Sequence, residues 1–318
     1  MTRSLGLTVP RLRGAVRRSH GSSLQRSRDR LYFPFLLPAL VLYLLLFVVP
    51  SLASLGFSLT KWAGLGSDIS WNGLGNYARL LTDPAFGTSF VNTLTLTVAG
   101  GLVVFGVTFL SMVVLREMRG RAFIRAIIFV PYILSPIAIG AAIGVLHNPD
   151  GALNLVIRAL GLNGLALAWL SPELIFKMII VGFIWSTTGF YVALLMSGVD
   201  SISPSLYEAA KISGASRLQQ FRYVTFPLTR DILATAAVLW VINGIKVFEI
   251  VIAFTGTAGT PPLEARTVAV QQFLSVTGGH GGVPDLGYSS AIGVVIFILS
   301  AVLVILVRRI LRAESVEQ

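Results

Sequence analysis

The sequence predicts an all-α, polytopic membrane protein with six transmembrane helices. Of its 318 residues, 54% are hydrophobic and only 12% are charged, whereas soluble domains carry about 25% charged residues. Six apolar stretches reach the length of about 20 residues that a helix needs to cross a bilayer. These stretches are residues 33–57, 90–115, 123–146, 175–199, 232–254 and 288–307. None shows the short alternating pattern of a membrane β-barrel strand.

The composition also excludes several other classes of protein. A chain this apolar is neither a water-soluble enzyme nor a disordered chain. It has no cysteine, so disulfides and thiolate metal ligands are impossible. Its three histidines, His20, His147 and His280, lie too far apart in the sequence to indicate a metal centre. The G-K-[ST], HExxH and GxSxG motifs are absent, so we expect no catalytic residue and no metal or cofactor bound by this chain.

The basic residues indicate how the six stretches are oriented. The net charge is +11, but Lys and Arg cluster between apolar stretches, which favours a membrane orientation signal over a nucleic-acid partner. Nineteen of the 25 basic residues fall in the N-terminal tail, in the links after the second and fourth stretches, and at the C-terminal end. Because cytoplasmic loops are enriched in Lys and Arg, we expect both termini in the cytoplasm.

The first 30 residues differ in composition from the rest of the chain. Residues 1–30 carry eight arginines and no acid before Asp29, and residues 31–318 form the predicted transmembrane domain. The composition of the tail favours a disordered cytoplasmic segment that lies on anionic membrane lipid. A transit peptide has a similar composition and is the alternative.

The third stretch contains residues that interrupt a simple helix. Pro131 and Pro136 each remove a backbone hydrogen bond. Gly140 and Gly144 follow with a four-residue spacing, which allows a neighbouring helix to approach closely. We therefore expect an interrupted span whose glycines allow close packing within the bundle.

The link between the fourth and fifth stretches, residues 201–230, is the most informative segment. It is longer than a connection needs to be, and it predicts two short helices that meet at a bend at Gly214. Pro204 suits a first helical position. Residues 205–208, Ser-Leu-Tyr-Glu, and residues 216–219, Ser-Arg-Leu-Gln, both have the capping-box pattern.

Pro227 is expected to end the second of these helices before the fifth stretch begins. With these positions in place, the link resembles the E-A-A-x3-G-x9-I-x-L-P loop of the membrane subunits of binding-protein-dependent ABC importers. The matching residues are Glu208, Ala209, Ala210, Gly214, Val224, Phe226 and Pro227. Val224 replaces Ile and Phe226 replaces Leu, and Ser213 stands where the carbohydrate branch, which includes maltose and glycerol-phosphate permeases, usually has Asp.

Other segments are similar to the same family from the first stretch to the C-terminus. They are Asn92-Thr93-Leu94 at the expected start of the second span, Phe123-Ile124-Arg125, the external loop residues 148–154, Phe248-Glu249 and Thr255-Gly256. The tail of residues 1–30 lies outside the resemblance.

The resemblance implies a permease subunit of an ATP-driven sugar importer in a bacterial inner membrane. Such a subunit pairs with a second homologous permease subunit and with two cytoplasmic ABC ATPase subunits, which hold the ATP and Mg. The external loops, residues 58–89, 148–174 and 256–287, would meet an extracytoplasmic solute-binding protein. The implied ATPase-coupling residues are Tyr207, Glu208, Ala209, Ala210, Gly214, Ala215 and Pro227.

The resemblance also implies where a sugar would pass, on the two spans that flank the link. The candidates are Phe183, Ser186, Thr187 and Phe190 in the fourth span, and Trp240, Asn243, Gly244 and Val247 in the fifth. Each set has a spacing of three to four residues and so shares one helical face. Aromatic rings stack on a sugar ring, and hydroxyl and amide groups bind its hydroxyls. Simple helix packing explains the same spacing and is the alternative.

An ion-gradient-driven secondary transporter is the alternative function. It predicts inverted repeats and several acids within the membrane, whereas Glu249 is the only carboxylate well inside a predicted span. Glu249 lies three residues after Lys246, so the two would share a helical face and are expected to pair there.

Overall fold

The computed structural model describes residues 34–64, 66–255, 261–279 and 282–311, and most of these residues are helical. The predicted basic tail, residues 1–30, lies outside the described residues. The chain divides into two units, Met1–Ala53 and Ser54–Gln318. Among the described residues, four helices are long and apolar enough to cross a membrane, and two bent helix pairs raise that number to as many as six.

The first unit contributes most of the helix Pro34–Phe57, whose mean hydropathy reaches 2.5. A π-helical turn, η1 (Leu44–Val48), interrupts it and leads into α2 (Val49–Phe57). Pro50 lies two residues after the end of this turn and has no N–H to donate to the preceding turn, which favours the wider winding.

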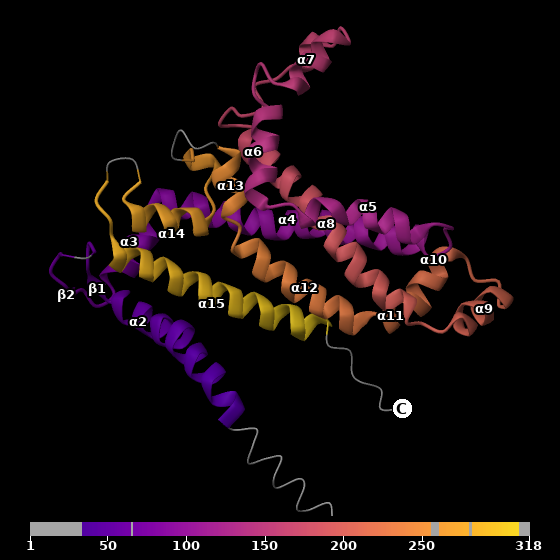
Figure 1. Ribbon diagram of the computed structural model, residues 1–318, viewed down its shortest axis with the longest axis horizontal. Helices are drawn as coiled ribbons and strands as arrows, with labels where there is room; N and C mark the ends of the chain where they lie inside the picture. The colour runs from indigo at the N-terminus through magenta and orange to yellow at the C-terminus, as the bar shows by residue number, and fades with distance from the viewer. Residues whose placement is uncertain (1–33, 65, 256–260, 280–281, 312–318) are drawn as a thin grey trace, which may run out of the picture. The chain divides into compact units, whose positions relative to one another are not determined.

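The second unit begins with a short ribbon and continues as helices (Figure 1). The ribbon pairs β1 (Thr60–Lys61) with β2 (Ser70–Trp71) in antiparallel register. The elements that follow are α3 (Gly75–Thr82), α4 (Pro84–Leu115), α5 (Arg121–Ile133), α6 (Pro136–Leu146), α7 (Ala152–Ala159), η2 (Asn163–Leu165), α8 (Ile175–Asp200), α9 (Pro204–Ile212), α10 (Arg217–Gln220), η3 (Phe221–Thr225), α11 (Phe226–Leu228), α12 (Arg230–Ile245), α13 (Glu249–Phe254), η4 (Leu263–Ala265), α14 (Val268–Thr277) and α15 (Leu286–Leu311).

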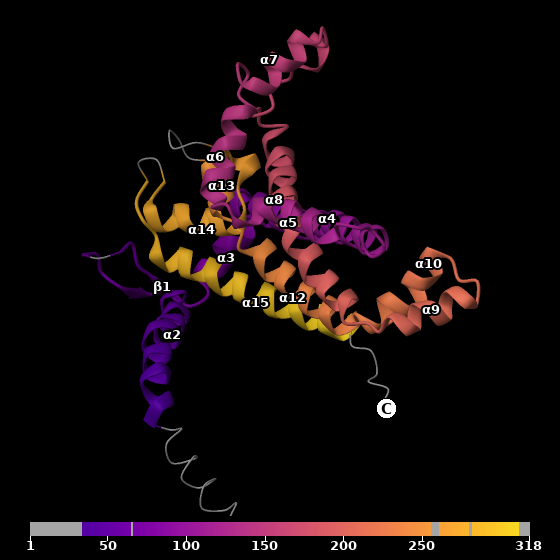
Figure 2. The same ribbon diagram turned by 45° about the vertical axis from the view of Figure 1, so that its right-hand side comes forward.

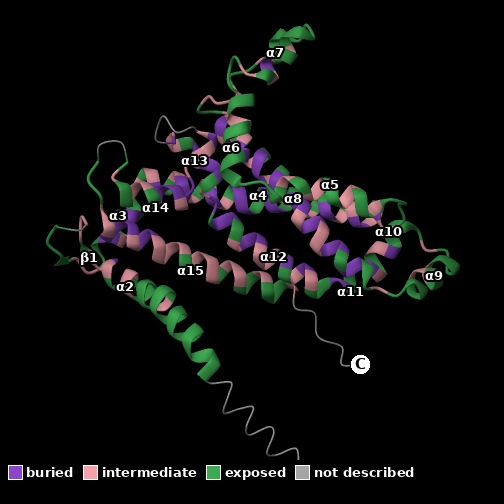
Figure 3. Cartoon of the chain, in the orientation of Figure 1, coloured by how far each residue is buried: buried purple, intermediate pink, exposed green. Residues whose placement is uncertain are grey.

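Helix α8 is the most enclosed of the long apolar helices. In its most apolar window 56% of the residues are buried, compared with 33% in α4 and 11% in α15. It packs against α4 and α5 and also touches α12, and buried residues occur along its whole length from Ile175 to Val199 (Figure 3). Helix α15 packs against α12 and α14. The core of this unit therefore lies around α8, which links the two ends of the bundle.

Helix α4 begins at Pro84, six residues before the predicted start at Phe90. Asp83 caps it by accepting a hydrogen bond from the Ala85 N–H at 2.8 Å, and a proline at the first position favours this start. Asn92 therefore lies inside the helix. Its side-chain amide donates to the carbonyls of Glu264 and Arg266 at 2.9 and 3.0 Å, so it holds the segment before α14 against α4.

The third span is interrupted between α5 and α6, as predicted, and the two helices meet at a bend of 90°. A Cβ placed on Gly140 would lie 2.8 Å from both the Ala253 Cβ and the Ile250 carbonyl oxygen, and one placed on Gly144 would lie 2.9 Å from the Phe254 carbonyl oxygen. Both glycines thus let α13 lie directly along α6, as Figures 1 and 2 show from two directions.

The fifth span was predicted as one helix over residues 232–254, and this is wrong. Helix α12 ends at Ile245 and α13 begins at Glu249. Nonhelical backbone at membrane depth is tolerated only where protein or a cavity satisfies it. Here Thr267 Oγ1 donates to the Val247 carbonyl at 2.6 Å. The break also separates Lys246 from Glu249, and the structure shows no ion pair between these two described residues.

The polar segments between the helices of this unit form two separate groups. In one group, Asn76 donates to the carbonyls of Ser58 and Thr60, and Arg79 pairs with Asp285 at 2.6 Å. In the other group, the link after α4 contacts the segment of residues 201–230. Each group thus joins segments that the distribution of basic residues assigns to the same side of the membrane.

The loop around α7 closes on itself through one buried side chain. Asn154 donates to the carbonyls of Pro149 and Leu167 at 3.0 and 2.9 Å, and it accepts a hydrogen bond from the Trp169 Nε1 at 2.8 Å. Asn154 is 1% exposed. Three bonds to its amide therefore fix both ends of this loop.

We predict that Gly140→Val destabilises the folded chain by about 1–3 kcal/mol more than Gly106→Val. Both substitutions place a β-branched residue in a helix, but a Cβ on Gly106 meets nothing within 4 Å, so the difference isolates the contact between α6 and α13. The measurement is the fraction of purified protein that stays folded in detergent after heating. Equal losses for the two variants would contradict the close packing.

Candidate coupling segment and membrane cavity

The predicted pair of short helices in residues 201–230 is confirmed, and Gly214 lies at the bend between them. Gly214 has φ +76°, a conformation that side-chain-bearing residues rarely adopt. Its own N–H donates to the Lys211 carbonyl, and the next N–H, of Ala215, donates to the Ala210 carbonyl, both at 2.9 Å. This is a Schellman motif. A Cβ on Gly214 meets nothing within 4 Å, so the backbone conformation, not space, requires glycine here.

Only one of the two predicted capping boxes forms. Ser216 and Gln219 make both bonds of the second box, at 3.3 Å to the Ser216 hydroxyl and 2.7 Å to the Gln219 Oε1. The first box is wrong because the N-cap of α9 is Ser203, two residues before Ser205. Pro204 occupies its first position, as predicted, and Ser203 is its N-cap without a capping bond. Glu208 is therefore released from capping; it is exposed and has no ion-pair partner among the described residues.

The second helix of the segment is longer and less regular than predicted. It continues from α10 through the π-helical turn η3 into α11 and ends at Leu228, one residue after Pro227. The chain then bends by 76° into α12. Pro227 cannot donate to the preceding turn, and the π-helical turn directly before α11 accommodates that missing bond. The segment therefore meets α12 at a sharp angle.

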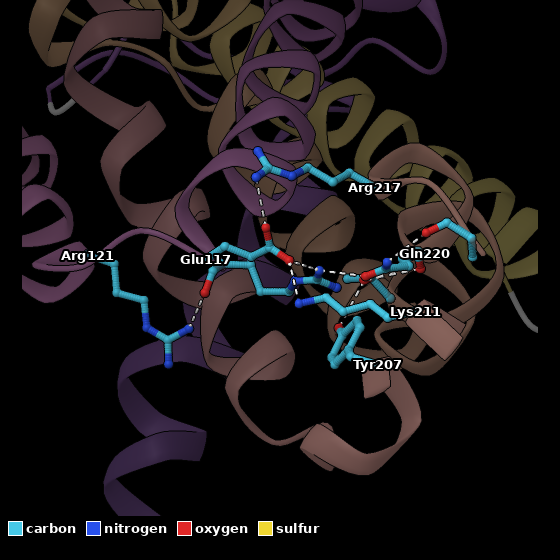
Figure 4. A network of polar contacts seen from close by, with 9 residues as sticks. Glu117, Arg121, Tyr207, Lys211, Arg217 and Gln220 are labelled. Carbon is cyan, nitrogen blue, oxygen red and sulfur yellow. Dashed lines mark hydrogen bonds and ion pairs between the residues drawn. The ribbon is translucent and has the colours of Figure 1, made fainter. Parts of the chain in front are cut away.

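Glu117, in the short link after α4, holds both helices of this segment (Figure 4). Its carboxylate lies 3.2 Å from the Lys211 Nζ at the end of α9 and 3.0 Å from the Arg217 guanidinium at the start of α10. Arg116 approaches the same carboxylate at 2.9 Å. One acid thus contacts a cation on each side of the bend.

Arg116 makes a parallel set of contacts. It donates to the Gln220 Oε1 at 2.7 Å, and its guanidinium lies 4.0 Å from the centre of the Tyr207 ring. The Tyr207 hydroxyl bonds to the Thr225 hydroxyl at 3.0 Å. Arg116 therefore also reaches both helices, through an aromatic face on α9 and an amide on α10.

A further ion pair joins the end of α8 to the start of α5. Asp200 pairs with Arg125 at 2.6 Å and with Arg121 at 3.2 Å. From the sequence, the arginines of this link indicated only the orientation of the chain, and a role for Glu117 was not predicted. The available signal was that Glu117 is the one acid beside three arginines between the second and third apolar stretches.

The surrounding cations also set the charge state of Glu117. The hydrogen bond from Arg116, followed by that from Lys211, holds the pKa of this carboxyl below its ordinary value of 4.5. A lowered folded-state pKa adds stability above the ordinary value, and this stability is lost as the pH falls through the lowered pKa. Glu117 is therefore ionised throughout the neutral range.

A cavity of about 540 Å³ lies where the breaks in the third and fifth spans face α8. Five of the predicted substrate-path residues line it: Phe183, Ser186, Thr187, Asn243 and Val247. Lys246, Glu249 and Tyr132 line it as well. The hydroxyls of Ser186 and Thr187 donate to the Phe183 carbonyl at 3.0 and 2.6 Å, so their oxygens remain as acceptors. The cavity thus presents hydroxyl, amide and charged groups beside apolar walls.

Three predicted substrate-path residues do not line this cavity. Trp240 is 3% exposed, and its Nε1 donates to the Thr97 carbonyl at 2.7 Å. A Cβ on Gly244 would lie 2.8 Å from the Thr97 Oγ1. Phe190 stacks on Tyr132, with ring centres 4.7 Å apart. In this structure Trp240 and Gly244 serve the packing of α12 on α4, and no face of the indole is open to a ligand.

The comparison with known proteins identifies the family. Residues 103–315 match the family described as binding-protein-dependent transport system inner membrane component. The chain therefore belongs to this family and is a multi-pass membrane permease subunit of an ABC transporter, not an enzyme. This membership replaces the alternative of an ion-gradient-driven secondary transporter.

Named relatives and a solved structure agree with this family. Probable ABC transporter permease protein YurN of Bacillus subtilis is 30% identical over 85% of this chain and 91% of its own length. Sulfoquinovosyl glycerol transport system permease protein SmoG of Agrobacterium fabrum is 30% identical over 90% and 92%. Trehalose/maltose transport system permease protein MalF of Thermococcus litoralis is 28% identical over 87% and 92%. A bacterial ABC transporter that imports alginate has a chain with the same fold, with a TM-score of 0.77 at 23% identity over 92% of this chain and 98% of that one.

We predict that Asn243→Ala and Trp240→Ala act in different ways. Asn243→Ala removes one polar group from the cavity, so uptake falls several-fold, which corresponds to about 1 kcal/mol, while the amount of folded protein is unchanged. Trp240→Ala leaves a hole beside α4 and costs about 3–5 kcal/mol of stability. Uptake is measured per molecule of permease in the membrane. Normal uptake by Asn243→Ala would place the solute path elsewhere.

Proposed function

We propose that this chain is the permease subunit of a sugar importer and forms one half of its translocation path. The observation that carries the proposal is the bent segment of α9 and α10 at one end of the apolar helices. It leaves Glu208 exposed and without an ion-pair partner in the part of the chain that the structure describes. Relatives named for trehalose and maltose, lactose, and diacetylchitobiose transport support a carbohydrate as the solute. The cavity beside α8 supplies the acceptors and donors that a polyhydroxy solute needs.

The segment of α9 and α10 would couple this subunit to an ATPase. The exposed surface of α9 carries Glu208 and Ala209 beside the Schellman end at Gly214. A partner cleft with a basic group would receive Glu208, and small alanines would permit close approach. The proposed coupling residues remain Tyr207, Glu208, Ala209, Ala210, Gly214, Ala215 and Pro227, with Tyr207 and Ala215 acting from inside the segment.

The complete transporter would contain a second homologous permease subunit and two cytoplasmic ABC ATPase subunits that bind ATP and Mg. An extracytoplasmic solute-binding protein would deliver the sugar to the opposite face. One solved structure with a similar fold is an alginate transporter in complex with an alginate-bound periplasmic protein. This complex supports a solute-binding protein as a partner of chains with this fold. The segments around Asn76, α7 and α14 would face it, and lipid would surround the apolar helices.

We predict that this subunit has six spans and both termini in the cytoplasm. The distribution of basic residues and the two separate groups of polar segments support this orientation. Reporter fusions at Arg121, Arg217 and Arg312 are expected to give a cytoplasmic signal, whereas fusions at Asn76 and Gly279 are expected to give an external one. An external signal at Arg217 would overturn both the orientation and the coupling role.

We predict that Glu208→Lys and Gly214→Val abolish uptake although the protein still inserts into the membrane. The lysine would repel a basic partner surface, and valine at φ +76° costs roughly 1–2 kcal/mol of backbone strain and distorts the end of α9. The measurement is co-purification of the ATPase subunits with the permease.

Matched controls separate coupling from general damage. Gly161→Val has the same φ of +76° and open space within 4 Å but lies in the loop after α7, and Glu173→Lys reverses an exposed acid outside the segment. Both controls are expected to retain the ATPase. If Glu208→Lys and Gly214→Val also retain it and transport normally, the segment is a passive linker and the proposal fails.

A further inference from the structure

We propose that Glu117 is a positioning residue that fixes the angle between α9 and α10 and transmits their movement to α4 and α5. This inference rests on the proposed coupling function of the segment. It assigns a role to a residue outside residues 201–230. The juxtaposition that supports it is one carboxylate between two helices that flank a glycine bend.

The bend itself offers little resistance to movement. No residue of α9 is buried, so apolar packing does not hold this helix in place. Gly214 has open space around its α-carbon, and the Schellman bonds at Ala210 and Lys211 fix only the end of α9, not the direction of α10. The orientation of the two helices must therefore come from side-chain contacts that cross the bend.

Glu117 supplies two of these contacts, beside those of Arg116 and the hydrogen bond between Tyr207 and Thr225. Lys211 lies three residues before Gly214 and Arg217 three residues after it, and the two cations contact different oxygens of the Glu117 carboxylate, at 3.2 and 3.0 Å. Opening or closing the bend would stretch at least one of these ion pairs. Figure 4 shows the carboxylate between the two side chains.

The local balance of charge makes Glu117 more important than an isolated surface ion pair. Arg116, Lys211 and Arg217 surround this single acid. The side chains of Arg116 and Glu117 are only 12% and 26% exposed, so solvent screens this pair less than it screens a fully exposed pair. The side chains of Lys211 and Arg217 are 58% and 69% exposed, so each of their ion pairs is weak alone, and the effect comes from the cluster as a whole. Without the carboxylate, three cations would face one another, and both helices would be pushed away from the link.

The link carries this contact directly to the membrane helices. Glu117 lies two residues after the end of α4 at Leu115. Helix α5 begins four residues after Glu117 at Arg121, which pairs with Asp200 at the end of α8. The other end of α5 reaches the cavity, because Pro131 and Tyr132 line it. Movement of α9 and α10 relative to the bundle would therefore act on the helix that forms one wall of the cavity.

The test measures the distance between α5 and α8 and does not require that the sugar be identified. Since the chain has no cysteine, spin labels attach only at two introduced positions, Ile133→Cys on α5 and Val181→Cys on α8, which are 69% and 56% exposed. The complete transporter, with cysteine-free partner subunits, is measured in liposomes with and without ATP and vanadate. The parent is expected to show an ATP-dependent change in the distance between the labels.

Glu117→Gln is expected to keep the ATPase subunits bound and to lose this change in distance. Asp231→Asn is the matched control, because Asp231 is an exposed acid at the start of α12 with no ion-pair partner among the described residues. It is expected to behave as the parent. Adding Lys211→Gln and Arg217→Gln to Glu117→Gln should cause no further loss, since interacting residues are not additive.

Two outcomes would overturn the role of Glu117 while leaving the coupling proposal intact, and a third would overturn the coupling proposal. If Glu117→Gln retains the parent's change in distance, Glu117 does not transmit movement, even though Glu208→Lys still releases the ATPase. If Glu117→Gln releases the ATPase, the residue only supports the structure of the docking helix. If Glu208→Lys retains both the ATPase and uptake, the coupling proposal itself is wrong.

Discussion

The constraint on which the structure depends is that backbone hydrogen-bonding groups within a membrane need partners inside the protein. Two of the apolar spans are interrupted, between α5 and α6 and between α12 and α13. At the second interruption, the Thr267 hydroxyl binds the Val247 carbonyl, and Gly140 and Gly144 allow α13 to lie against α6. Because these contacts stabilise irregular backbone, the two interruptions can face α8 and leave a polar cavity in an otherwise apolar bundle.

The segment of residues 201–230 is held by a different kind of interaction. Helix α9 buries no residue, so its position depends on charged and polar side chains instead of on apolar contact. Arg116 and Glu117 each reach both sides of the bend at Gly214. A rigid apolar interface would resist movement, whereas hydrogen bonds and ion pairs beside water permit a hinged segment to change its angle and return. This combination suits a segment that binds a moving partner.

Local sequence signals predicted much of the structure. Apolar length gave the positions of α4, α8 and α15, and the Ser216 box and the bend at Gly214 follow from local capping and backbone rules. The sequence predictions were wrong where residues distant in the chain determine the local structure or the contacts of a side chain. The fifth span breaks because Thr267, twenty residues away, satisfies the Val247 carbonyl. Trp240 has the spacing of a ligand-binding residue, but its partner is the carbonyl of Thr97 on α4. Glu117 was missed because its cations lie about a hundred residues later in the chain. No local pattern reports such pairings.

The loop around α7 has a practical consequence for the design of altered forms of this protein. Asn154 makes its three hydrogen bonds within the loop, to Pro149, Leu167 and Trp169. The exposed residues between them, including Gly161 with its open surroundings, are not needed to close it. An affinity tag or a fluorescent domain inserted near Gly161 should therefore leave the ends of α6 and α8 in place.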